Sequence, residues 1–228
     1  MIRMLTVTAI AFFTATTAWS ADAPTAAPLS GAKPPSVPVA DQTPPKPFVY
    51  APKNTDVVTG KGDVPVTIVE YASLSCPHCS HFFLHVLPDI TAKYIDAGKA
   101  KLVYRDFPLN DPALKAAELV QCADPSQRHA FVKVLFSTQM KWAYDSSYRE
   151  ALSNIAVLGG IDRLKFESCM NNKSIEKAIL NVAKEASDDY HINSTPTFYI
   201  NGTEYKGDRD TASMSKVIDA ELAKAVKK

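Results

Sequence analysis

Ser75-Cys76-Pro77-His78-Cys79-Ser80 is the stretch that decides the fold. Residues 64–71 before it have the composition of a buried strand, and an apolar stripe of helical spacing follows it at Phe83, Leu87, Ile90 and Tyr94. Both thiols would therefore lie at the start of a helix, where free backbone N–H groups and the helix dipole favour a thiolate. Cys79 would lie one turn beyond Cys76 on the same face, close enough to form a disulfide with it.

The two residues between the cysteines fit the same chemistry. Pro77 suits the first helical position, because the N–H that it lacks would have no partner there. His78 can add a hydrogen-bond donor or a positive charge beside the sulfur, which lowers the pKa of a thiol. The motif therefore predicts a thiol–disulfide redox site in which Cys76, Pro77, His78 and Cys79 are the catalytic residues.

Other uses of a C-x-x-C pair stay open at this point. A zinc site needs a second ligand pair at suitable spacing, and Cys122 and Cys169 are isolated from one another. His81 and His85 follow on the same predicted helix, so metal capture by cysteine and histidine is one alternative. Two purely structural cysteines are another. We expect redox chemistry, with no bound metal and no cofactor.

The bulk composition is that of an ordinary globular protein. The chain has 228 residues, of which 46% are hydrophobic and 21% charged, so it can bury a core. Its formal net charge is +1, without a basic block, and we expect no nucleic-acid partner. Four cysteines are too few for a disulfide scaffold, but the even number fits one redox pair and one structural pair.

The start of the chain indicates export. Residues 1–20 read as a secretory signal peptide. Arg3 gives its start a positive charge, an uncharged and mainly apolar stretch follows, and the small residues Ala18 and Ser20 stand at its end. We expect a periplasmic protein in an oxidising compartment; a permanent membrane anchor is the alternative. Residues 21–49 are rich in proline and alanine, which predicts an extended linker or tail, either a spacer or a segment without a specific role.

Periodicity along the rest of the chain predicts an α/β domain interrupted by helices. Residues 99–107 read as a strand that pairs in parallel with the strand before the cysteines. Residues 111–173 carry only helical signals, with Asp111 and Asp124 as predicted N-caps before prolines. A long helix then precedes a strand at 197–200, an Asn201-Gly202 hairpin and a last helix. We therefore expect one domain from residues 50–110 and 174–228, with a helical insert at 111–173.

Three residues outside the motif carry further predictions. Glu70 lies in an otherwise apolar strand, where burial would raise its pKa and let it exchange a proton with Cys79. A solvated glutamate at a sheet edge is the alternative. Cys122 and Cys169 both fall in the insert, and in an exported protein we expect them to form a structural disulfide rather than stay free. In the chain-entropy model, a disulfide that closes a loop of this length stabilises the folded protein by roughly 4 kcal/mol.

Together these features resemble the DsbA-like thiol:disulfide oxidoreductases of the bacterial periplasm. The likeness rests on the C-P-H-C motif after a strand, Glu70 upstream, the segment Tyr-Arg-Asp-Phe-Pro at 104–108, the helical insert, and Thr195-Pro196-Thr197 before a late strand. It covers the chain from about Phe48 onward and implies a thioredoxin fold with an inserted α-helical domain. It also implies that Pro196 is cis and lies against the cysteines, with Thr195 offering backbone groups to an extended substrate.

The resemblance implies that the chain introduces disulfide bonds into unfolded or reduced exported proteins. A substrate thiolate would attack Cys76, a second would resolve the mixed disulfide, and a membrane quinone-linked partner resembling DsbB would reoxidise the cysteines. A disulfide isomerase or reductase is the alternative within the same chemistry. A periplasmic copper- or zinc-handling protein, or a binding module with a structural disulfide, are alternatives from other classes.

Overall fold

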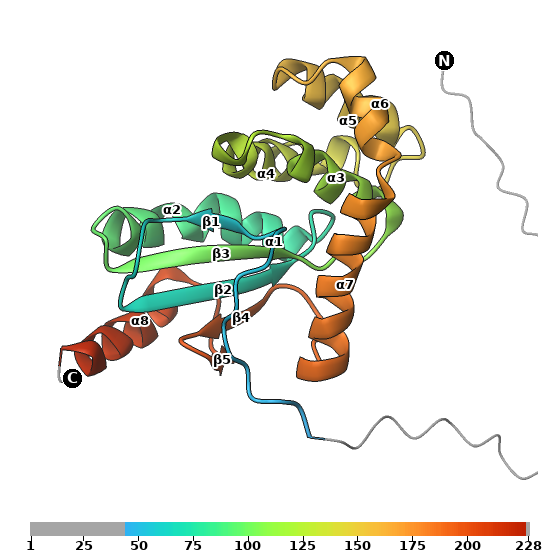
Figure 1. The fold of residues 1–228 in the computed structure, drawn as a ribbon. Coiled ribbons are helices and arrows are strands. Elements are labelled where there is room, and N and C mark those ends of the chain that lie inside the picture. The colour runs from blue at the N-terminus through green and yellow to red at the C-terminus, as the bar shows by residue number, and fades with distance from the viewer. Residues whose placement is uncertain (1–43, 227–228) are drawn as a thin grey trace, which may run out of the picture. The chain divides into compact units, whose positions relative to one another are not determined.

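A five-stranded mixed sheet is the centre of the computed structural model, which describes residues 44–226 (Figure 1). Its strand order is β1-β3-β2-β4-β5, so β2 lies in the middle. The strands are β1 (Val57–Thr59), β2 (Val66–Ala72), β3 (Ala100–Asp106), β4 (Thr197–Ile200) and β5 (Thr203–Tyr205). The predicted parallel pairing of β2 with β3 is confirmed, and every other pair is antiparallel. The predicted hairpin is also present, with Asn201 and Gly202 at positive φ as a tight turn requires.

Both faces of β2 are buried, because different helices cover them. Ile68 and Ala72 belong to a core that also contains the helix after Cys76 and the last helix, α8 (Thr211–Ala225). Val69 and Tyr71 belong to a second, smaller core with α7 (Lys173–Tyr190). Alternate residues of a strand point to opposite faces, so this arrangement places Glu70 on the same face as the cysteines.

The helix after Cys76 is continuous but wider than an α-helix in two turns. It consists of α1 (Pro77–His81), a π-helical turn (Phe82–Val86), α2 (Leu87–Ile90) and a second π-helical turn (Thr91–Ile95). The first π-helical turn directly precedes Leu87-Pro88. Proline has no N–H to donate within a helix, which fits a departure from α-helical geometry here. The local prediction for Pro77 is confirmed, since α1 begins at this residue.

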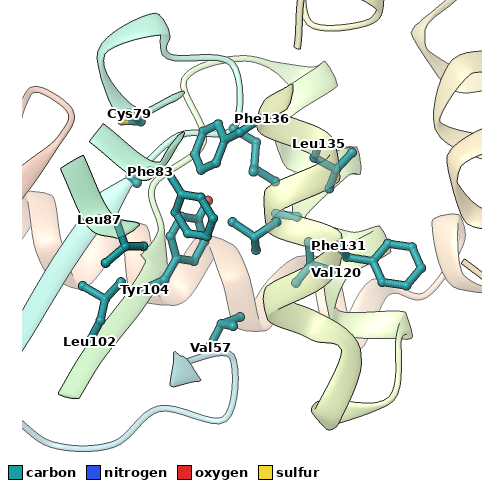
Figure 2. Packing of buried hydrophobic residues seen from close by; sticks show 14 of the residues in the cluster. Val57, Cys79, Phe83, Leu87, Leu102, Tyr104, Val120, Phe131, Leu135 and Phe136 are labelled. Carbon is teal, nitrogen blue, oxygen red and sulfur yellow. The ribbon is translucent and has the colours of Figure 1, made fainter. Parts of the chain in front are cut away.

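Four α-helices separate β3 from α7 along the chain. They are α3 (Asp111–Cys122), α4 (Arg128–Ser137), α5 (Tyr148–Leu158) and α6 (Arg163–Met170). Their core is continuous with that of the sheet: Figure 2 shows Phe136 of α4 beside Phe83 and Tyr104. The ring centroid of Phe136 lies 5.1 Å from that of Phe83. The insert therefore packs directly on the elements that carry the cysteines.

Two details differ from the sequence predictions. The N-cap of α3 is Asn110 rather than Asp111, because the Asn110 side chain accepts a hydrogen bond from the N–H of Ala113 at 2.9 Å. Phe48, which falls in the predicted linker, is buried and stacks on Tyr199 with the ring centroids 4.1 Å apart. The predicted signal peptide and residues 21–43 of the predicted linker lie outside the described residues. No helix within residues 44–226 has the length and hydropathy needed to cross a bilayer.

Candidate active site

The two cysteines of the motif lie at the end of a short loop that links β2 to α1. Cys76 is the N-cap of α1, with extended backbone angles, and its carbonyl accepts a hydrogen bond from the N–H of Ser80 at 3.1 Å. Cys76 is 6% exposed and Cys79 is fully buried. Neither forms a disulfide in this structure.

The surroundings of Cys76 favour its thiolate. Hydrogen bonding from the Cys79 thiol is the largest cause, and it lowers the pKa of Cys76 from 9.0 to about 5 although burial opposes this. The Thr195 side chain and the backbone N–H groups of Cys79 and His78 lower the pKa further. His78 therefore acts through its backbone, and its imidazole is exposed to solvent. The prediction that the His78 side chain assists Cys76 finds no support among these contacts.

Cys79 has the opposite character. Burial raises the pKa of its thiol well above 9.0, and the hydrogen bond to Cys76 and the negative charge of Glu70 add to the effect. At neutral pH the site thus holds one thiolate, on Cys76, and one thiol, on Cys79. A proton must leave Cys79 each time that this sulfur attacks a disulfide, so the site needs a proton acceptor near it.

Glu70 is the acidic group next to the cysteines. It lies in β2, in register with Tyr104 of β3 and Phe198 of β4, and its side chain is fully buried. Neither carboxyl oxygen has a hydrogen-bond partner among the described residues. Burial raises the pKa of Glu70 well above its usual value, and the charge of Cys76 adds to this. The predicted burial is confirmed, and the alternative of a solvated edge residue is excluded.

A second buried acid lies on the same face of the sheet. The Tyr104 hydroxyl donates to Oδ1 of Asp106 at 3.1 Å, and Oδ2 of Asp106 has no partner among the described residues. Burial is the main reason that the pKa of Asp106 is raised to about 7. Sequence reasoning used these two residues only for the family resemblance. Their two-residue spacing on a strand next to Glu70 is the signal that could have placed them near the site.

The segment before β4 closes the site from the other side. The Thr195–Pro196 peptide bond is cis, as the resemblance implied. The Cys76 thiol lies 3.4 Å from the backbone oxygen of Thr195, to which it can donate when protonated. Oγ1 of Thr195 is buried without another partner among residues 44–226, and it favours the thiolate. Thr195 and Pro196 therefore lie where they were predicted, against the cysteine pair.

Two residues of the insert reach the active-site loop, and sequence reasoning missed both. Gln139 donates hydrogen bonds to the backbone oxygens of Leu74 and Cys76, and the Tyr144 hydroxyl donates to that of Ser75. Trp142 is fully buried, whereas Tyr144 is exposed. No local sequence pattern indicates such contacts, because the partners are more than 60 residues apart in the chain.

The second cysteine pair and the histidines lie apart from this chemistry. Cys122 and Cys169 form a disulfide that joins α3 to α6, with the two Cα atoms 6.2 Å apart. His81 and His85 follow Cys79 on the same helix, both exposed, with ring centroids 5.2 Å apart. Within the described part of the chain, no three histidine, cysteine or acidic side chains cluster in a way that could hold a metal ion.

Comparison with known proteins identifies relatives with the same chemistry. A family model described as Thioredoxin matches residues 53–220. A Rickettsia prowazekii protein, provisionally named protein-disulfide oxidoreductase, is 32% identical over 177 residues, which are 76% of this chain and 65% of the relative. A Bacillus anthracis protein, provisionally named disulfide bond formation protein D, is 30% identical over 183 residues, covering 78% of this chain and 82% of the relative.

A solved structure extends the likeness to three dimensions. The crystal structure of Wolbachia pipientis α-DsbA1 superimposes with a TM-score of 0.71 at 33% sequence identity, covering 77% of this chain and 94% of that one. The rickettsial relatives are longer, and the alignments cover only 63% to 65% of their length. The likeness to α-DsbA1 includes the helical insert, since it spans nearly all of that chain.

Proposed function

The chain belongs to the DsbA-like branch of the thioredoxin superfamily, and we propose that it oxidises cysteine pairs in other proteins. The observation that carries this proposal is the asymmetry between its two thiols. The pKa of Cys76 is lowered to about 5, whereas that of Cys79 is raised well above 9.0. One sulfur is therefore a good leaving group at neutral pH, and the other is protected in the core.

The reaction starts from the oxidised Cys76–Cys79 disulfide. A substrate thiolate attacks Sγ of Cys76, the bond between the two cysteines breaks, and its electron pair goes to Sγ of Cys79. A second substrate thiolate then attacks the substrate sulfur of this mixed disulfide. Cys76 leaves as a thiolate, the substrate gains a disulfide, and the enzyme is left with two reduced cysteines.

Glu70 supplies the proton that these reaction steps require. When Cys79 is released it carries a negative charge in a fully buried position, which is unfavourable without protonation. The raised pKa of Glu70 favours the protonated carboxyl group, which can give this proton to Cys79. In the reverse step the carboxylate takes the proton back when Cys79 attacks a mixed disulfide.

The stability of the Cys76 thiolate is what makes the reaction favour substrate oxidation. With a pKa of about 5, roughly 99% of Cys76 is ionised at pH 7 in the reduced enzyme. The stable thiolate lowers the free energy of the reduced enzyme. Reduction of the Cys76–Cys79 disulfide by substrate thiols is therefore favourable. Substrates in extended conformation can bind along the backbone of Thr195 next to cis-Pro196, beside the reactive sulfur.

The wider role follows from the N-terminal sequence and the relatives. We propose that the protein is exported to the periplasm, where it acts on reduced exported proteins, and that a membrane quinone-linked protein resembling DsbB reoxidises it. The signal-like residues 1–20 support the location. An oxidising compartment supports the direction of the reaction, since disulfides persist there.

The test is the equilibrium of the purified protein with glutathione, together with oxidation of a reduced model protein. We expect a reduction potential near that of DsbA, about −120 mV, and turnover that is lost in Cys76→Ala. A potential near that of thioredoxin, about −270 mV, would support the reductase alternative and refute the oxidase. Repair of scrambled disulfides in place of net oxidation would identify an isomerase. Full activity of Cys76→Ala, or stoichiometric copper or zinc, would refute the enzymatic proposal.

A further inference from the structure

Three consecutive backbone oxygens at the redox centre accept hydrogen bonds from side chains of the helical insert. Nε2 of Gln139 lies 2.7 Å from the oxygen of Leu74 and 3.1 Å from that of Cys76. The hydroxyl of Tyr144 lies 2.5 Å from the oxygen of Ser75. The insert thus contacts every residue from Leu74 to Cys76, the last of which is the nucleophile.

We propose that Gln139 and Tyr144, which we call the loop clasp, are positioning residues that hold Cys76 in its reactive orientation. The inference rests on the proposed function and adds to it a role for the insert. Without the clasp, the oxygen of Cys76 would keep its hydrogen bond from the N–H of Ser80, but those of Leu74 and Ser75 would lose their side-chain donors. With it, the sulfur stays directed at the backbone N–H groups of α1 and at Thr195.

Burial makes the Gln139 half of the clasp strong. Gln139 is 4% exposed, so little water competes for its amide, and both N–H bonds of Nε2 have an acceptor. The amide belongs to a 3₁₀ turn (Gln139–Lys141) that is anchored on the insert by the fully buried Trp142. The Trp142 indole N–H donates to the oxygen of Leu135 at 3.1 Å. The insert therefore holds the Gln139 amide in place independently of its contact with the loop.

Tyr144 forms the outer half of the clasp. Its residue is 59% exposed, so the ring borders the solvent from which a substrate reaches Cys76. Burial and the charge of Cys76 raise the pKa of Tyr144, which favours the protonated hydroxyl as a donor. Tyr144 thus contacts the backbone of Ser75 from the insert, whereas Thr195 contacts the Cys76 thiol from the segment before β4.

The direction of the clasp's hydrogen bonds has an electrostatic consequence for the Cys76 thiolate. A carbonyl oxygen carries partial negative charge, and an oxygen near a thiolate disfavours it unless a donor partly neutralises that charge. Gln139 and Tyr144 supply such donors to all three oxygens. Loss of the clasp should therefore destabilise the Cys76 thiolate, and not only the fold.

The test compares Gln139→Leu and Tyr144→Phe with a control, Tyr94→Phe. Tyr94 is also a buried side chain whose polar group donates a hydrogen bond, to Oδ1 of Asp219 at 2.8 Å, but it lies in the second π-helical turn, more than four helical turns beyond Cys76. The readouts are the thiolate absorbance at 240 nm against pH, the glutathione equilibrium, and urea unfolding. We expect Gln139→Leu to raise the pKa of Cys76 by about 0.5–1 unit and to shift the equilibrium about 3- to 10-fold toward the oxidised protein. Tyr144→Phe should cause a smaller shift in the same direction.

Tyr94→Phe should lower stability and leave both thiol readouts unchanged. If Gln139→Leu behaves like this control, the clasp has only a structural role and the proposal is wrong. Should Gln139→Leu fail to fold, Tyr144→Phe decides, because an unchanged thiol titration in that exposed variant refutes the clasp. A wild-type Cys76 that titrates like a free cysteine would refute the proposed function instead, so the two failures are distinct.

Discussion

Replacing Cys79 tests the origin of the Cys76 thiolate most directly. The hydrogen bond from the Cys79 thiol is the largest single cause of the lowered pKa of Cys76. Cys79→Ala removes this donor, whereas Cys79→Ser keeps a hydroxyl donor at the same place. Both substitutions also leave Cys76 as the only free thiol, because Cys122 and Cys169 are joined in a disulfide.

The size of the effect follows from the strength of the bond that is lost. A hydrogen bond to a charged group contributes about 1.5–3 kcal/mol, and one pKa unit corresponds to 1.36 kcal/mol. Cys79→Ala should therefore raise the pKa of Cys76 by about 1–2 units, from about 5 to between about 6 and 7. The smaller side chain also admits water to a buried sulfur, which favours the thiolate, so the rise should not exceed this range.

The assay is the absorbance of the thiolate at 240 nm in the reduced variants between pH 3 and 9. The rate of alkylation by iodoacetamide against pH gives an independent value. At pH 6 about nine-tenths of wild-type Cys76 should be ionised, against about one-tenth to one-half in Cys79→Ala. Cys79→Ser should titrate within about half a unit of the wild type.

Two results would refute this reasoning. If Cys79→Ala titrates at about 5, the thiol of Cys79 is not the main cause, and the backbone N–H groups of α1 suffice. If Cys79→Ser shifts as far as Cys79→Ala, the donor at this position does not matter and the change in packing does.

Three further predictions concern the buried acid, the pH dependence of stability and the second disulfide. Glu70→Gln should slow the attack of the inner cysteine on a glutathione mixed disulfide by about 10²-fold in stopped flow, and an unchanged rate would exclude its proton role. The pKa of Cys76 is lower in the folded than in the unfolded chain, so its stabilising effect is complete above about pH 9 and is lost as pH falls toward 5. Urea unfolding of the reduced protein against Cys76→Ser should therefore show a difference that grows by about 2.3 kcal/mol from pH 5 to pH 7; a constant difference would contradict the lowered pKa. The Cys122→Ala/Cys169→Ala double variant should lose up to about 4 kcal/mol of stability with the Cys76 titration unchanged, and a shifted titration would show that this disulfide influences the redox site.

Much of the architecture was predictable because its signals are local. Two of these signals depend on residues a few positions apart: Pro77 at the first helical position and the Asn201-Gly202 hairpin. The parallel pair β2–β3 follows from the rule for strand–helix–strand units, which holds for most proteins. The pairing of Cys122 with Cys169 was predictable for another reason. With the motif cysteines assigned to redox chemistry, no other partner was left.

The family resemblance supported the predictions about residues far apart in the chain, which local sequence patterns could not make. It placed Pro196 against Cys76, 120 positions earlier in the chain, and it implied that the insert interrupts a thioredoxin fold. The structure shows both; it also shows the His78 side chain exposed, with the backbone N–H of His78 favouring the Cys76 thiolate. A motif indicates which residues are near the sulfur in sequence, but not whether a backbone or a side chain provides the contact.

By itself, the sequence determined the position of the two thiols at the start of a helix, the presence of a glutamate in the strand before them, and the order of strands and helices. Only the tertiary structure decided that Gln139 and Tyr144 reach the active-site loop and that Tyr104 and Asp106 form a second buried acidic site. The physical reason is that a pKa depends on burial and on donors at distances of about 3 Å. Those distances arise from the packing of elements far apart in the chain.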